Sequence, residues 1–251
     1  MLLSSCLSLS LLLGVVLKGY EAKYAPEVTT KSGKIRGVLA NLNTGGTIRK
    51  YIGVPFAKAK RFKEPVDPDQ WTGVKDTIAF GKICPQLPSA MEKVAGMSED
   101  CLNLNVFVPH GASKSLPVMV WVHGGAFNSG SNKIYDGSYI ATLGDVIVVA
   151  INYRLNVFGF LATGSDGDLK GNYGMLDQIH ALKWVKANID AFGGDPKKVT
   201  IFGESAGGAS VALLVLSPLT KGLFQNAILQ SGDANAMWAY KSYDEALPLA
   251  K

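Results

Sequence analysis

Short apolar runs recur along the middle and C-terminal parts of the chain. They lie at Asn103–Val108, Val118–Val122, Val146–Ile151, Val199–Phe202 and Ala227–Gln230. The first three do not alternate cleanly between apolar and polar residues, which predicts strands of a central sheet that are buried on both faces. Helical patterns follow at 173 to about 191 and at about 206 to 216. Strands that alternate with helices predict parallel βαβ units, so the predicted fold class is α/β with a mostly parallel central sheet and flanking helices.

The region before these runs has a different pattern. Residues 28–40 alternate between apolar and polar around the turn Ser32-Gly33, and residues 47–57 are again strand-like. Together they predict a small N-terminal antiparallel ribbon. Residues 58–100 are rich in Lys, Pro and Gly and show no regular pattern.

The N-terminal segment has the features of a signal peptide. Cys6–Leu17 is an uncharged, mostly apolar run, too short to cross a membrane and of the length typical of a signal sequence. We expect residues 1–22 to be the signal peptide, with an imprecise cleavage site between Gly19 and Ala22, and residues 23–251 to form one domain. The alternative is a buried N-terminal helix. A signal peptide would place the mature protein outside the cell or in the lumen of the secretory pathway, where disulfides form.

Composition excludes several classes of protein. The 251 residues are 47% hydrophobic and include 25 Lys and Arg against 20 Asp and Glu, a formal net charge of +5. This apolar fraction is sufficient for a packed core. The basic residues are scattered, so we expect no nucleic-acid partner. No apolar stretch reaches the roughly 18 residues of a membrane span, so we expect no stable membrane insertion.

Three cysteines are present, and Cys6 would leave with the signal peptide. The remaining two, Cys84 and Cys101, either close a loop as a disulfide or remain two buried thiols. The sequence has no C-x-x-C motif and no nearby pair of histidines, so we expect no zinc site and no other metal.

The most specific chemical signal is a G-x-S-x-G motif. The strand-like segment KVTIF (198–202) runs directly into Gly203-Glu204-Ser205-Ala206-Gly207, and an apolar helical pattern follows. In this context the motif is a nucleophile elbow, a sharp turn that exposes the serine hydroxyl at the N-terminus of a helix. Glycine is required at 203 and 207 because a side chain there would collide with the neighbouring elements. We therefore predict Ser205 as the catalytic nucleophile.

A second motif supplies the matching electrostatic element. WVHGGAF (121–127) follows an apolar strand and opens a loop with two adjacent glycines. Gly124 and Gly125 can present backbone N–H groups to a developing oxyanion, with the N–H of Ala206 as a third donor. We interpret His123 as a structural residue that braces this loop through a ring hydrogen bond, and not as the catalytic base.

These motifs stand within a longer resemblance. The sequence resembles the type-B carboxylesterase/cholinesterase family of α/β-hydrolases over nearly all of the mature chain. The matching segments are SEDCLNLNVFVP (98–109), WVHGGAF (121–127), INYRLNVFGFL (151–161), GNYGMLDQIHALKWVKANIDAFGGDPKKVTIFGESAGG (171–208) and AILQSG (227–232).

The resemblance implies an α/β-hydrolase fold and hydrolysis of small-molecule carboxylic esters through an acyl-serine intermediate, with no metal or organic cofactor. It implies Ser205 as nucleophile, and Gly124, Gly125 and Ala206 as the oxyanion hole. Glu204 matches a position that orders water and substrate. The resemblance also implies three pairings: the disulfide Cys84–Cys101 and the ion pairs Arg61–Glu99 and Arg154–Asp177.

The sequence also departs from the family. The triad order in this fold is Ser, then Asp or Glu, then His, but no histidine follows Ser205. Of the three histidines present, we place His110 in a surface loop and expect His180 to point to solvent. We therefore predict no triad acid and no triad histidine in this chain, and interpret it as the N-terminal portion of a longer enzyme.

This interpretation predicts negligible turnover of simple esters by this chain. It also predicts an uncovered sheet edge and insoluble or loosely packed material on expression alone. The alternatives are a cholinesterase-like, non-catalytic adhesion or binding protein, or a fragment without function. Residues 85–100 contain no tryptophan, which favours a general carboxylesterase over a cholinesterase. The ester and the oligomeric state are left open.

Overall fold

The computed structural model describes residues 24–87, 96–111, 115–164, 167–242 and 245. The expected signal peptide lies outside these residues. The strands are β1 (Tyr24–Thr30), β2 (Gly33–Asn41), β3 (Thr47–Pro55), β4 (Val74–Asp76), β5 (Asn103–Pro109), β6 (Leu116–Val122), β7 (Ile147–Ile151), β8 (Gly194–Glu204) and β9 (Asn226–Gln230). The helices are α1 (Ser138–Gly144), α2 (Asn156–Phe160), α3 (Tyr173–Asn188) and α4 (Ala206–Leu216), with 3₁₀ turns at Ile189–Phe192 and Pro218–Thr220. No helix in these ranges is both long and apolar enough to cross a membrane.

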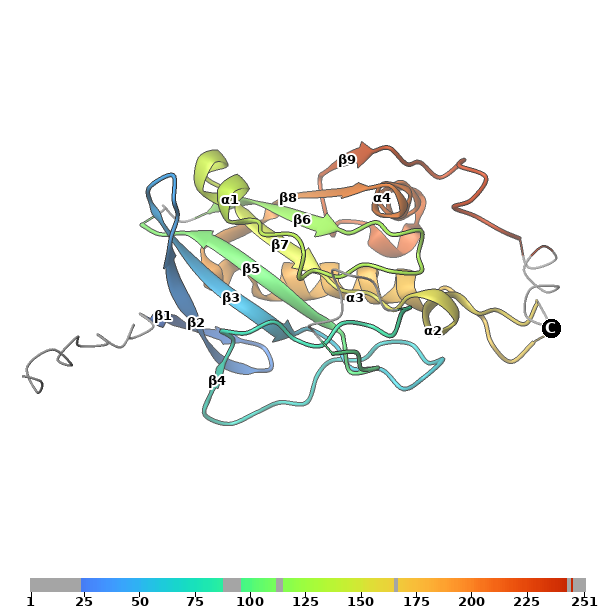
Figure 1. Ribbon diagram of the computed structural model, residues 1–251, viewed down its shortest axis with the longest axis horizontal. Helices are drawn as coiled ribbons and strands as arrows, with labels where there is room; N and C mark the ends of the chain where they lie inside the picture. The colour runs from blue at the N-terminus through green and yellow to red at the C-terminus, as the bar shows by residue number, and fades with distance from the viewer. Residues whose placement is uncertain (1–23, 88–95, 112–114, 165–166, 243–244, 246–251) are drawn as a thin grey trace, which may run out of the picture.

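The described strands form one mixed sheet in the order β1-β2-β3-β5-β7-β6-β8-β9, with β4 paired to β2 (Figure 1). Neighbours from β1 to β7 are antiparallel, whereas β7, β6, β8 and β9 are mutually parallel. The predicted N-terminal ribbon is present and continues through the β3–β5 pair into the central sheet. The parallel part carries the β-α-β units that the sequence predicts.

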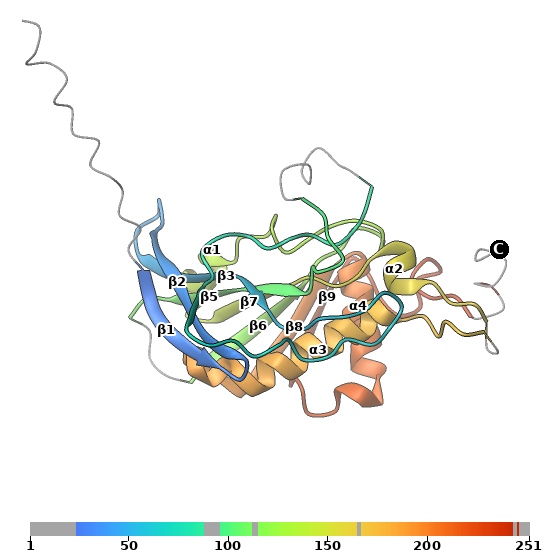
Figure 2. The ribbon, with the colours of Figure 1, turned by 90° about the horizontal axis from the view of Figure 1, so that it is seen from below.

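The two faces of the sheet are covered by different helices. Figure 2 shows α3 along one face and α1 beyond the other. On the α3 side, alternate residues of the central strands pack with α3 and α4 in the main hydrophobic core. On the α1 side, a smaller core contains Phe107, Ala141, Val148 and Ala150. We call the α3 side of the sheet the covered face and the α1 side the open face.

Burial on both faces, expected for the three central strands, is observed for two of them. Every residue of β5 and of β7 is buried. In β6, Val118, Val120 and Val122 are buried, but Met119 and Trp121 are only half-buried. The reason is that α1 makes its main contacts with β3, β5 and β7, so that it covers β6 less completely. Strand β9 is mostly exposed, in agreement with the predicted uncovered edge.

Some elements carry no recognisable sequence pattern. Strand β4 is three exposed residues that pair with β2 through the backbone. Helices α1 and α2 have seven and five residues, too short to show a helical period. Strand β8 begins at Gly194, before the apolar run, because Gly194 pairs with Leu116 ahead of an irregularity in the β6–β8 register.

Candidate active site

Ser205 lies at the junction of β8 and α4 in a strained backbone conformation. Its φ of 56° and ψ of −121° are unfavourable for a residue with a side chain. A Cβ on Gly203 would stand 2.5 Å from the Gly207 backbone, and a Cβ on Gly207 would collide with the carbonyl oxygen of Val122. The predicted need for glycine at both positions is therefore confirmed, and the turn is the sharp strand-to-helix elbow that the motif indicates.

Neighbouring backbone holds the elbow in place. The Ser205 N–H donates to the carbonyl of Gln230 in β9 at 2.8 Å, and the Ser205 carbonyl accepts from Ala209 N at 2.9 Å. A Cβ on Gly232 would collide with the Ser205 carbonyl, so the segment after β9 passes directly against the turn. Ser205 is half-buried and Glu204 is exposed. Contacts from α4, from β9 and from the segment after β9 thus maintain the strained conformation of Ser205.

The glycine loop after β6 lies beside the elbow. A Cβ on Gly124 would stand 3.1 Å from Ser205 Cβ and 3.2 Å from the Glu204 Oε2 atom. Gly124 and Ser205, 81 positions apart in the sequence, thus meet because β6 and β8 are parallel neighbours whose carboxyl ends share one edge of the sheet. Ala206 begins α4, so its N–H has no partner within the helix.

His123 is a buried, neutral residue beneath this loop. Its Nδ1 lies 2.8 Å from the Gly124 carbonyl oxygen, and its ring stacks on Tyr153 with centroids 4.4 Å apart. Burial lowers its pKa to about 4, against the opposing effect of the Gly124 hydrogen bond. Because Nδ1 faces a carbonyl, that nitrogen carries the proton, and Nε2 has no hydrogen-bond partner in the described part of the chain. The predicted ring hydrogen bond is present.

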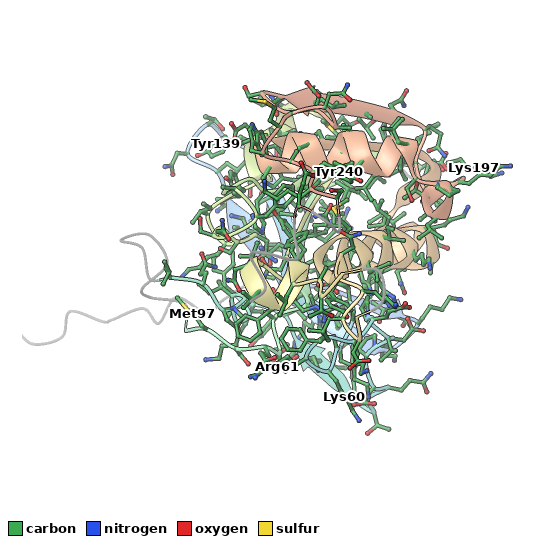
Figure 3. All side chains as sticks on the ribbon, turned by 90° about the vertical axis from the view of Figure 1, so that its right-hand side faces the viewer. Lys60, Arg61, Met97, Tyr139, Lys197 and Tyr240 are labelled. Atoms are coloured by element: carbon green, nitrogen blue, oxygen red, sulfur yellow. A yellow bond between two sulfur atoms is a disulfide. The ribbon has the colours of Figure 1, made fainter. Side chains whose placement is uncertain are left out.

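The pairings implied by the family resemblance are all present. Cys84 and Cys101 form a disulfide, so the alternative of two free thiols is wrong. Arg61, labelled in Figure 3, pairs with Glu99 at the surface. The Arg154–Asp177 pair is buried, with Nε–Oδ2 and Nη2–Oδ1 distances of 2.8 and 2.7 Å.

The other two histidines have different surroundings. His110 is exposed, as expected. The expectation that His180 points to solvent is wrong, because its ring is half-buried and its Nε2 lies 3.0 Å from Asp67 Oδ1. The segment that contains Asp67, which has no regular sequence pattern, packs over this side of α3. No cluster of metal-ligating side chains occurs among the residues that the structure describes.

Comparison with known proteins agrees with this geometry. A family model described as the carboxylesterase family matches residues 24–250. The chain belongs to the carboxylesterase family. Its mixed sheet and flanking helices are accordingly part of an α/β-hydrolase fold.

Three relatives illustrate the range of the family. The para-nitrobenzyl esterase of Bacillus subtilis (strain 168) is 50% identical over 84% of this chain and 44% of its own length. The cholinesterase of Mus musculus is 43% identical over 89% of this chain and 40% of its own length. Neuroligin-3 of Mus musculus is 41% identical over 94% of this chain and 34% of its own length. The chain thus spans less than half the length of these relatives.

Aromatic residues from three segments meet at the end of the glycine motif. Phe127, at the end of the glycine motif, has its ring centroid 5.0 Å from that of Phe160 and 6.4 Å from that of Trp238. Trp238 belongs to the segment that follows β9, and half of its side chain is exposed. The three aromatic positions are far apart in the sequence, so no local pattern predicts that they meet. The aromatic residue in Gly124-Gly125-Ala126-Phe127 is the one local sign of this cluster.

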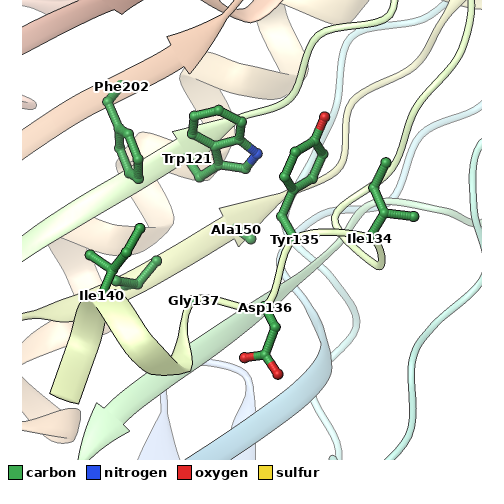
Figure 4. Close-up of a pocket in the computed structure, with 9 residues that line it drawn as sticks. Trp121, Ile134, Tyr135, Asp136, Gly137, Ile140, Ala150 and Phe202 are labelled. Atoms are coloured by element: carbon green, nitrogen blue, oxygen red, sulfur yellow. The ribbon is translucent and has the colours of Figure 1, made fainter. Parts of the chain in front are cut away.

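A separate apolar cavity lies on the open face, with a volume of about 260 Å³ (Figure 4). Trp121, Phe202 and Ile140 are among its lining residues, and Ser205 and the glycine loop are not. The Trp121 Nε1 atom is buried without a hydrogen-bond partner in the described residues. The cavity marks where α1 ends above the sheet.

Proposed function

We propose that this chain provides the nucleophile and the oxyanion hole of a carboxylic ester hydrolase. The observation that carries the proposal is the strained Ser205, placed beside Gly124 at the N-terminus of α4. A strained serine at this kind of turn is pre-organised for attack, and strain of this kind concentrates at functional sites. Family membership supports ester hydrolysis as the chemistry.

In the proposed reaction the Ser205 hydroxyl oxygen attacks the ester carbonyl carbon. The backbone N–H groups of Gly124, Gly125 and Ala206 stabilise the negative oxygen of the tetrahedral intermediate, aided by the helix N-terminus. Collapse of the intermediate expels the alcohol and leaves the acyl group on Ser205, and water then releases the acid. The serine proton passes to a base and from there to the departing alcohol.

No residue of this chain is assigned as that base. No histidine follows Ser205 in the sequence, His123 is buried and neutral, and His180 is paired with Asp67. We likewise assign no triad acid. We propose that the 251 residues alone turn over simple esters negligibly and that the missing groups come from outside them.

The surroundings of the elbow suggest how a substrate is held. The Glu204 carboxylate lies beside Gly124, where it can order water or the polar part of an ester. Phe127, Phe160 and Trp238 offer an apolar surface to the acyl or alcohol group. We propose a small-molecule ester as substrate. The Cys84–Cys101 disulfide supports export to an oxidising compartment.

A second candidate function is a non-catalytic binding protein that uses the same fold. It is favoured by the absence of a histidine after Ser205 and by a relative, Neuroligin-3, whose name is not that of an esterase. The intact elbow around Ser205 favours the hydrolase.

A fluorophosphonate probe tests the proposal, because it reacts with activated serines. Because the chain has no assigned base, the probe is used with imidazole added as the proton acceptor. We expect labelling at one residue, loss of that labelling in Ser205→Ala, and unchanged labelling in Ser217→Ala, a matched control at the far end of α4. Equal labelling of the Ser205→Ala variant would contradict the proposal. Fast hydrolysis of a nitrophenyl ester by the chain would contradict the absence of a base.

A further inference from the structure

Gln86 is a buried side chain, outside both site motifs, that binds one residue of the glycine loop through two hydrogen bonds. Its Oε1 accepts from the Gly130 N–H at 2.8 Å, and its Nε2 donates to the Gly130 carbonyl at 3.0 Å. Nε2 also lies 3.1 Å from the Cys84 carbonyl oxygen. Only 8% of Gln86 is exposed. The amide therefore satisfies both backbone groups of Gly130, as a neighbouring strand would.

Gly130 in turn lies against the proposed oxyanion hole. It has a φ of 112°, and a Cβ there would stand 2.5 Å from His123 Nδ1 and 2.7 Å from the Gly124 carbonyl oxygen. The turn between them is closed by Gly125, whose carbonyl accepts from Asn128 N at 2.9 Å. A shift of Gly130 would therefore move the peptide that carries the proposed oxyanion donors.

Gln86 itself is fixed from the opposite side. It stands two residues from Cys84, which the disulfide joins to Cys101, two residues before β5. The carbonyl of the intervening Pro85 accepts from Asn156 Nδ2 at 2.7 Å. The amide is thus anchored by a covalent cross-link and by the first residue of α2.

We propose that Gln86 is a positioning residue of the oxyanion hole, which it holds through Gly130. The inference rests on the proposed function. Oxyanion stabilisation depends on donors held within about 0.5 Å of the productive geometry. Without the Gln86 amide, the N–H and the carbonyl of the half-buried Gly130 lose their partners, and the loop has to move to satisfy them.

The test compares Gln86→Leu with a matched control, Gln225→Leu, in the full chain. Gln225 also binds backbone through its amide, accepting from Val199 N at 2.8 Å, but in the middle of β8, six residues before Ser205. The first measurement is amide hydrogen exchange at Gly124, Gly125 and Gly130, and the second is the rate of fluorophosphonate labelling of Ser205 with imidazole added as the proton acceptor. In Gln86→Leu we expect exchange at Gly130 to rise at least ~10-fold and labelling to slow by ~10- to 100-fold, within the range seen when an oxyanion donor is removed. The control should change neither.

A second variant, Gln86→Glu, separates positioning from general damage. An ionised carboxylate can accept from Gly130 N but cannot donate to the Gly130 carbonyl, whereas a protonated carboxyl can do both. We expect labelling of this variant, relative to the unchanged chain at each pH, to recover on acidification. A flat ratio across pH would contradict the proposal.

The outcomes distinguish this role from the proposed function. Folded Gln86→Leu with unchanged exchange and unchanged labelling overturns the positioning role. Absence of labelling in the unchanged chain, with imidazole present as the proton acceptor, overturns the proposed hydrolase. In that case the positioning role is judged from amide exchange at Gly124 and Gly125 alone. Faster exchange at these residues in Gln86→Leu supports the role of Gln86 in holding the loop, and unchanged exchange overturns it.

Discussion

The two faces of the sheet are built by alternate residues of the same strands, yet they differ in burial. On the covered face, Val120 in β6 and Ile201 in β8 are fully buried. On the open face, the adjacent Trp121 is half-buried and Ile228 in β9 keeps 45% of its surface exposed. Trp121, Phe202 and Ile228 follow one another across the register of the three parallel strands. An apolar run therefore specifies a strand, but the helix above each face decides whether that face is buried.

Helix length accounts for the difference. On the covered face, α3 and α4 have 16 and 11 residues and extend along the strands. On the open face, the seven residues of α1 make their main contacts with β3, β5 and β7, and the cavity of Figure 4 lies between Ile140 of α1 and Trp121 of β6. Equivalent substitutions on the two faces should therefore have unequal effects.

The largest difference is expected between two aspartates. Asp177 on α3 is fully buried against Arg154, whereas Asp136 before α1 is half-exposed and pairs with Lys50. Asp177→Ala leaves a guanidinium uncompensated in the interior and should lower the free energy of unfolding by about 3 to 5 kcal/mol. Asp136→Ala should lower it by about 1 kcal/mol. Urea denaturation followed by tryptophan fluorescence measures both, and equal losses would contradict the comparison.

Two leucines give the same comparison without charge. Leu182 on α3 is 1% exposed, and Leu143 on α1 is 80% exposed. Leu182→Ala should lower the free energy of unfolding by about 2 to 5 kcal/mol, because it removes packed methyl groups and leaves a cavity. Leu143→Ala should change it by less than about 0.5 kcal/mol. The midpoints of denaturant unfolding report both values, and a large effect at Leu143 would mean that the open face is covered in solution.

The sequence predicts these features unevenly, for physical reasons. Ser205, Gly203 and Gly207 were identifiable because the elbow is local, and its constraints fall on five consecutive residues. The contact between Gln86 and Gly130 could not be identified from the sequence, because it joins two irregular segments 44 residues apart. His180 was placed wrongly because its partner, Asp67, comes from a segment with no period.

The prediction of burial also fails for one face of β6. The run Val118–Val122 looks the same as the fully buried β7, and nothing in it indicates that α1 stops short of Trp121. Burial on a sheet face depends on elements distant in the chain, so the pattern of one strand cannot contain it. Strand positions were therefore predicted well and their exposure poorly.

A third test concerns His123, one residue beyond β6, where burial is complete. Burial lowers its pKa to about 4, whereas the ordinary value is 6.5, so the unfolded chain binds the proton more readily than the folded one. The resulting stability is present above pH 6.5 and is lost as the pH falls towards 4. We expect this residue alone to remove about 2 kcal/mol from the free energy of unfolding between pH 7.5 and 5.

The control for this test is His123→Gln, which cannot titrate. Its free energy of unfolding should fall less than that of the unchanged chain over the same pH interval. His110, which is exposed, serves as a second control, since His110→Gln should leave the pH dependence unchanged. If the free energy of unfolding depended on pH in the same way in His123→Gln and in the unchanged chain, the ring would be accessible to protons in the folded state.

The smallest effect on stability, and a clear effect on solubility, is expected at the sheet edge. Ile228 and Ala227 are adjacent in β9, but Ile228 is on the open face and Ala227 packs against the main core. Ile228→Lys should raise the soluble fraction on expression, because a charge on an exposed edge strand opposes pairing with other chains, and should change the free energy of unfolding by less than about 0.5 kcal/mol. Ala227→Lys should lower both, because it places the same charge towards α4. If Ile228→Lys and Ala227→Lys changed the soluble yield equally, aggregation would not proceed through this edge.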